Sequence, residues 1–92
     1  MVLIYKKKNF NIYSYKDIYI VHNTKKEFSK GHTHIRSFKS SKFIIDLSIH
    51  KSIPRHLNKY FLVSLLRLSN DDIYSEKLRN IIKSLENKKD SN

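Results

Sequence analysis

The spacing of apolar residues changes once along this chain, and that change is the feature that most limits its fold. Up to about residue 23, apolar and aromatic residues alternate with polar ones, which is the period of a β-strand. Beyond about residue 33 they recur near helical spacing, on one side of each expected helix. We therefore expect an α+β domain, in which a small antiparallel N-terminal sheet or hairpin is followed by three helices.

Three short runs in the first part predict β-strands. Each run is rich in β-branched or aromatic residues and is bounded by polar residues that suit turns. A charged connection at residues 24–30 follows the third run. We expect the strands at residues 2–5, 10–15 and 18–23, within a sheet or hairpin formed by residues 1–23.

The second part predicts three helices separated by two breaks. Proline disfavours helical backbone at the residue before it and suits the first position of a helix, so Pro54 marks the first break. Asn70 and Asp71 are typical of a helix start and mark the second. The first helix has two plausible N-caps, Thr33 and Ser37. We expect helices at residues 33–51, 54–68 and 71–87, followed by a frayed charged tail at residues 88–92.

The second of these helices is the most hydrophobic and is expected to be central. Its apolar residues recur at helical spacing and include Phe61, Leu65 and Leu68, which we place near the middle of the core. A chain of 92 residues can bury one modest core, so residues 1–92 are expected to form a single domain.

The chain carries a formal net charge of +11, from 19 lysines and arginines against 8 acidic residues. A field this positive attracts phosphate backbones, acidic proteins or anionic membranes. Residues 1–53 hold 11 basic and 3 acidic side chains, a net +8, so the basic surface belongs mainly to the first part. The hydrophobic content of 39% is too high for a disordered basic tail.

Cysteine is absent, which excludes a disulfide framework and a thiolate metal site and fits a reducing cytosol. The apolar run at residues 2–5 precedes three lysines instead of following them, which is the reverse of the order in a secretion signal. The longest apolar region, residues 60–68, is too short to cross a bilayer. We expect a cytoplasmic protein with no membrane partner and no cofactor.

The best candidate for a binding site is the basic stretch around the only glycine, Gly31. A glycine lets the backbone bend close to a ligand, and a helix that began just after it would present free N–H groups to an anion. An arginine in the same stretch would match phosphate oxygens with its planar guanidinium fork. The alternative interpretation is an ordinary solvated loop in a lysine-rich protein. The residues that we expect to contact nucleic acid are Lys25, Lys26, Lys30, Gly31, His32, His34, Arg36, Lys39 and Lys42.

Two histidines in this stretch leave other chemistries open. A base, an acid and a cation are sufficient for metal-independent cleavage of RNA, and His32, His34 and Arg36 supply those residue types. Zinc would need a third and usually a fourth ligand, and no recognised spacing supplies them, so we expect no metal site.

Tyr13, Tyr15 and Tyr19 form a second candidate surface if they line one face of the sheet. Bases of single-stranded nucleic acids stack on such faces. Tyrosines also cover half-buried strands in small sheets, and we favour that simpler interpretation.

In size, lysine-rich composition and strand-then-helix layout, the chain resembles small basic single-domain proteins of phages and mobile elements in AT-rich Gram-positive bacteria. Some of those proteins are anti-CRISPR inhibitors, so the resemblance implies an inhibitor of a bacterial defence ribonucleoprotein as one alternative. The charge favours a different first hypothesis, which is non-enzymatic binding of nucleic acid, RNA before DNA, or of a nucleoprotein complex. The metal-independent ribonuclease is the third alternative.

Overall fold

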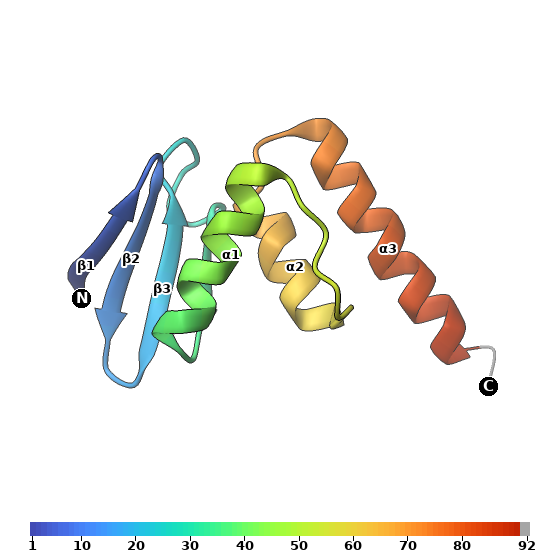
Figure 1. The fold of residues 1–92 in the computed structure, drawn as a ribbon, viewed down its shortest axis with the longest axis horizontal. Coiled ribbons are helices and arrows are strands. Elements are labelled where there is room, and N and C mark those ends of the chain that lie inside the picture. Colours follow the sequence, from blue (N-terminus) through green and yellow to red (C-terminus); the bar gives the residue numbers. More distant parts are fainter. Residues whose placement is uncertain (91–92) are drawn as a thin grey trace.

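The computed structural model describes residues 1–90, and the side chains of residues 1–87. Four strands form one antiparallel sheet in the order β1-β2-β3-β4, and three helices follow them in the chain (Figure 1). This arrangement confirms the expected α+β fold. The strands are β1 (Val2–Lys7), β2 (Phe10–Tyr15), β3 (Ile18–Asn23) and β4 (His32–Ile35), and the helices are α1 (Phe38–His50), α2 (Lys59–Leu68) and α3 (Asp72–Asp90).

Alternation along the strands decides which side of the sheet is buried. Ile12 lies opposite Val21 in the β2–β3 pair, and both side chains are fully buried in the core together with Phe10. Tyr13 and Ile20, which are also opposite each other, belong to the other side of the sheet. Figure 1 shows all three helices on one side of the sheet. We call that side the inner face and the opposite side the outer face.

The segment that forms β4 is a strand, so the expected helix start at residue 33 is wrong. Thr33 and Ile35 are β-branched and occupy alternate positions of a segment paired with β3, which suits a strand better than a helix. The Thr33 hydroxyl donates to Ser64 Oγ at 2.7 Å instead of capping a helix. The helix begins after Ser37, whose Oγ accepts a hydrogen bond from the N–H of Ser40 at 3.0 Å.

The connection between α1 and α2 is longer than the sequence predicts. Helix α1 ends at His50, and its C-cap, Lys51, adopts the left-handed backbone conformation with φ of 53°. The break at Pro54 is present, but the expected helix start at residue 54 is wrong. Helix α2 begins after Asn58, whose side-chain oxygen accepts hydrogen bonds from two N–H groups of the first turn. A start at Pro54 would have had apolar Ile53 as its N-cap, which cannot accept such bonds.

Helix α3 begins one residue later than expected and extends further. The Asp71 carboxylate accepts a hydrogen bond from the Tyr74 N–H at 2.7 Å and pairs with Lys51 Nζ at 2.9 Å. Both interactions lower the pKa of the Asp71 carboxyl, and the hydrogen bond from the Tyr74 N–H has the larger effect. The helix continues through residues 88–90, so the expected helix end at residue 87 is wrong, and residues 91–92 of the expected frayed tail lie outside the described residues.

The core lies between the inner face and the helices, with α2 at its centre. Leu62, Leu65 and Leu68 of α2 are fully buried, whereas Phe61 is only partly buried. Helix α1 packs against the sheet and α3 packs mainly against α2. No helix in the described part of the chain combines the length and apolar content needed to span a bilayer.

The three tyrosines of the second candidate surface do not share one face of the sheet. Tyr19 lies on the inner face, where its ring centroid is 5.9 Å from that of Phe38. Tyr13 and Tyr15 alternate with the inner residues of β2 and lie on the outer face. The simpler interpretation of Tyr19, a residue that covers a half-buried strand, therefore fits its position.

Replacing Leu65 with Ala is expected to lower the free energy of unfolding by roughly 2–5 kcal/mol, because a fully buried leucine leaves a cavity when it is truncated. Val63→Ala is the control on the same helix, and because Val63 is 37% exposed its loss should be about 1 kcal/mol or less. Urea unfolding followed by circular dichroism measures both. Equal losses would show that α2 does not present Leu65 to the core.

Candidate functional site

Gly31 is buried and marks a close approach of two backbone segments, not a left-handed turn. Its φ is not positive, its N–H donates to the carbonyl of Glu27 at 2.8 Å, and its carbonyl accepts from the N–H of Asn23 at 3.0 Å. A Cβ atom at this position would lie 2.5 Å from Lys26 Cβ. Strand β4 follows the glycine, so the expected helix N-terminus directly after Gly31 is wrong.

Lys26 is half-buried, and its side chain lies against the end of α2. Its Nζ donates to the backbone carbonyls of Arg67 and Ser69, each at 2.9 Å, at the C-terminal end of α2. Burial, and to a smaller extent the nearby Arg67 charge, lowers the pKa of Lys26. Arg67 in turn donates from Nε to the carbonyl of His32 at 2.9 Å. Both cations therefore attach α2 to the β3–β4 connection.

Three histidines gather on the outer face with Phe28 from the β3–β4 connection. The Phe28 ring stacks on His32, with centroids 4.4 Å apart and an interplanar angle of 7°. His22 Nε2 donates to the carbonyl of Lys26 at 2.9 Å, and His32 Nδ1 donates to the carbonyl of Phe28. The ring centroid of His34 lies 5.2 Å from that of His32. Among the residues that the structure describes, no group of three or more histidine, aspartate or glutamate side chains is placed to hold a metal ion.

The remaining predicted lysines do not converge on one site. Lys25 lines a small polar hollow of about 330 Å³ that includes two other lysines. Lys42 places its Nζ 4.9 Å from the centre of the Phe38 ring, which is a cation–π contact. Lys30 is exposed in the β3–β4 connection, and Lys39 is exposed on the first turn of α1. The predicted contact residues are therefore spread over several surfaces.

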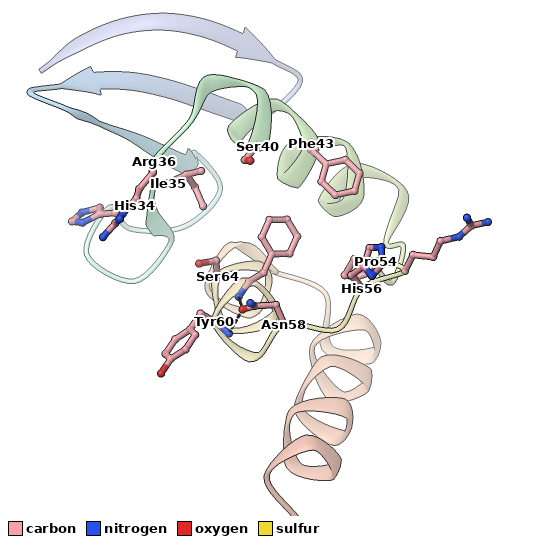
Figure 2. A pocket seen from close by; sticks show the side chains of 12 residues that line it. His34, Ile35, Arg36, Ser40, Phe43, Pro54, His56, Asn58, Tyr60 and Ser64 are labelled. Atoms are coloured by element: carbon pink, nitrogen blue, oxygen red, sulfur yellow. Dashed lines mark hydrogen bonds between the residues drawn. The ribbon is translucent and has the colours of Figure 1, made fainter. Parts of the chain in front are cut away.

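His34 and Arg36 belong to a groove of about 550 Å³ between β4, α1 and α2. Pro54, Arg55 and His56, from the connection before α2, also line it. Figure 2 shows His34 and Arg36 at one end of the groove and Pro54 and His56 at the other, with α1 and α2 between them. The groove therefore brings together basic residues that lie about twenty positions apart in the sequence.

Three aromatic residues also line this groove, and Figure 2 shows Phe43 on α1 between its two ends and the Tyr60 ring on the outer side of α2. The ring centroids of Phe43 on α1 and Phe61 on α2 are 6.0 Å apart, with an interplanar angle of 25°. Phe43 is 51% exposed, and Tyr60, beside Phe61 in the first turn of α2, is 81% exposed. Rings this exposed add little to the core and present flat apolar surfaces to a ligand.

The groove is also basic. Helices α1 and α2 run in the same direction, so their N-terminal ends lie at the same end of the molecule (Figure 1), and residues from both first turns line the groove. Neither first turn contains an acidic residue, and no carboxylate occurs among the described residues that line the groove. The groove therefore receives positive charge from two sources, the N-terminal ends of two helix dipoles and the guanidinium groups of Arg36 and Arg55.

Sequence patterns identified one end of the groove and missed the other. They place Arg55 and His56 in the first turn of a helix and assign no role to Phe43 or Tyr60. One signal was available, because both aromatic residues lie outside the apolar stripes that predict the buried sides of their helices. The long connection that carries Arg55 to the groove has no comparable signal.

No protein-family model matches this chain, and no curated protein sequence and no solved structure shows significant similarity to it. A functional assignment therefore depends on the geometry and chemistry of the groove.

Replacing Gly31 with Ala is expected to lower the free energy of unfolding by about 1–3 kcal/mol, because the added methyl group would collide with Lys26 Cβ. Ser29→Ala is the control, since Ser29 is exposed in the same connection and should change stability by less than about 0.5 kcal/mol. Urea unfolding of both variants measures the difference. A Gly31→Ala variant as stable as the parent would show that the two segments can separate without loss.

Proposed function

We propose that this protein binds single-stranded nucleic acid in the groove between β4, α1 and α2, RNA before DNA, and without chemical turnover. One observation carries the proposal: a single concave surface joins two arginines to two exposed aromatic rings and has no acidic side chain among its described lining residues. The net charge of +11 adds a long-range attraction for phosphates.

Each part of the groove has a chemical role in this proposal. Arg36 lines the groove just after β4 and Arg55 lines it from the connection before α2, and their guanidinium groups bind phosphate oxygens with bidentate, charge-assisted hydrogen bonds. Bases between those phosphates stack on Phe43 and Tyr60, and each stacked base contributes roughly 1–3 kcal/mol. Two arginines and exposed aromatic rings on one surface suit a short single strand, which offers both phosphates and unpaired bases.

The aromatic surface favours single strands over duplexes, because the faces of paired bases are covered by their neighbours in a helix. Hydroxyl groups of Ser40 and Ser64 also line the groove. A 2′-hydroxyl can donate to and accept from such groups, which supports RNA over DNA. Binding of matched RNA and DNA oligonucleotides measures this preference.

Arg36→Ala and Arg55→Ala are each expected to weaken binding of a fluorescent single-stranded RNA about ten-fold, because a charge-assisted phosphate contact is lost. Each substitution should also reduce the slope of log affinity against log salt by about 0.7. Arg79→Ala removes the same charge from an exposed position on α3 and should change affinity by less than about two-fold. Fluorescence anisotropy over a salt series gives these values, and similar losses in all three variants would indicate diffuse attraction only.

Phe43→Leu and Tyr60→Leu are each expected to weaken RNA binding by roughly 5- to 100-fold, because leucine stays apolar but cannot stack on a base. Phe28→Leu is the matched control, since Phe28 is 39% exposed and its ring lies against His22 and His32 of the outer face. The duplex form of the same RNA should bind more weakly than the single strand. If Phe28→Leu causes the larger loss, the nucleic acid binds the outer face instead of the groove.

The same RNA should be recovered intact after long incubation with the protein. Shortened products that require His34 or His32 would favour the ribonuclease alternative. Retention of one ribonucleoprotein from a native host extract, more tightly than free RNA, would favour an inhibitor of that complex.

A further inference from the structure

Strand β1 is an open edge of the sheet. It ends the strand order, so the outward N–H and C=O groups of this strand have no partner strand in the described sheet (Figure 1). The opposite edge, β4, lies against α2: Thr33 Oγ1 donates to Ser64 Oγ, and Arg67 Nε donates to the carbonyl of His32. Of the two edges, β1 is therefore the one able to pair with a further strand.

The open edge is also apolar where it begins. Met1, Val2, Leu3 and Ile4 are consecutive apolar residues and are 61, 62, 45 and 44% exposed. None of these four side chains is charged, although the chain contains 19 lysines and arginines and charged side chains commonly keep sheet edges from pairing. The lysines of this strand begin only at Lys6.

We propose that β1 pairs antiparallel with β1 of a second copy of this chain, around a two-fold axis close to Leu3 and Ile4. This pairing places the apolar starts of the two strands opposite each other and the two lysine runs, residues 6–8, at opposite ends of the contact. Parallel pairing would set the lysine runs side by side, where like charges repel. An acidic partner strand would match the lysine run but not the uncharged stretch, which favours a second copy over such a partner.

This pairing produces a dimer and no larger assembly. Each β1 edge is used once across the two-fold axis, and the β4 edges of both copies stay against α2. A contact through one strand of six residues, which also contains a β-bulge, is smaller than the roughly 800 Å² per partner of a standard interface, so the dimer is reversible. The groove lies beside β4, at the far edge of the strand order from β1, and stays open in the dimer.

The proposed dimer and the binding of nucleic acid are expected to respond in opposite ways to salt concentration. Each copy carries +11, so two copies repel each other and screening by salt strengthens the dimer. Phosphate contacts weaken as salt rises. The two proposals therefore succeed or fail independently.

Sedimentation velocity of the protein without nucleic acid tests the dimer. In moderate salt the mass should rise from 11.0 kDa toward twice that value as the protein concentration increases. Ile4→Lys places a charge at the centre of the contact and should keep the mass at 11.0 kDa at every concentration. Ile73→Lys makes the same chemical change at a position of α3 that is 73% exposed, and it should associate like the parent. A monomeric parent, species larger than a dimer, or equal loss in both variants would overturn the proposal.

Cross-linking gives a second measurement that does not depend on how Ile4→Lys folds. The chain has no cysteine, so Leu3→Cys introduces a single thiol at the expected contact and Ile73→Cys introduces one far from it. Mild oxidation should convert most of the Leu3→Cys protein to a disulfide-linked dimer and little of the Ile73→Cys protein at the same concentration. Equal yields of dimer from the two variants would overturn the proposal.

Discussion

The C-terminal end of α2 is held by hydrogen bonds from β3 and the connection that follows it, and most of the structure depends on this attachment. Fully buried Asn23 donates from Nδ2 to the carbonyl of Leu68 at 2.8 Å, and Lys26 Nζ donates to the carbonyls of Arg67 and Ser69. The last carbonyls of a helix have no partner within it, and a cation is favoured beside them. The last carbonyl groups of α2 therefore find hydrogen-bond donors in β3 and in the connection that follows it. The apolar side of the same helix packs on the sheet.

This attachment also sets the direction of α2 and with it the place of the groove. Because the C-terminal end of α2 lies beside the β3–β4 connection, its N-terminal end lies where α1 also begins (Figure 1). Residues 51–58 must then run back along the helices to join the end of α1 to the start of α2. That return path carries Arg55 and His56 into the groove that Arg36 lines, although the local sequence gives no reason for the encounter.

Some basic side chains of this protein form ion pairs within the fold, and others line the groove, where the described residues include no carboxylate. Lys7 pairs with Asp46 at 2.7 Å and Lys51 pairs with Asp71 at 2.9 Å, and such exposed ion pairs add little to stability because water and salt screen them. The groove lacks a carboxylate among its described lining residues, so its guanidinium groups have no such partner within it. The positive charge of the groove is therefore not offset by a carboxylate among those lining residues.

The sequence by itself determined the elements that depend on local pattern. Alternating apolar residues specify β2 and β3, and the leucine stripe specifies α2 with Leu65 on its buried side, because periodicity acts within one element. The predicted helix starts at residues 33 and 54 were wrong, although Ser37 was one of the two expected N-caps, because pairing of β4 with β3 and capping by Asn58 overrode local preference. Only the tertiary structure decided which basic residues share a site. Lys26 lies against α2 and Arg55 shares a groove with Arg36, because those positions depend on how the two ends of α2 are held and not on spacing along the chain.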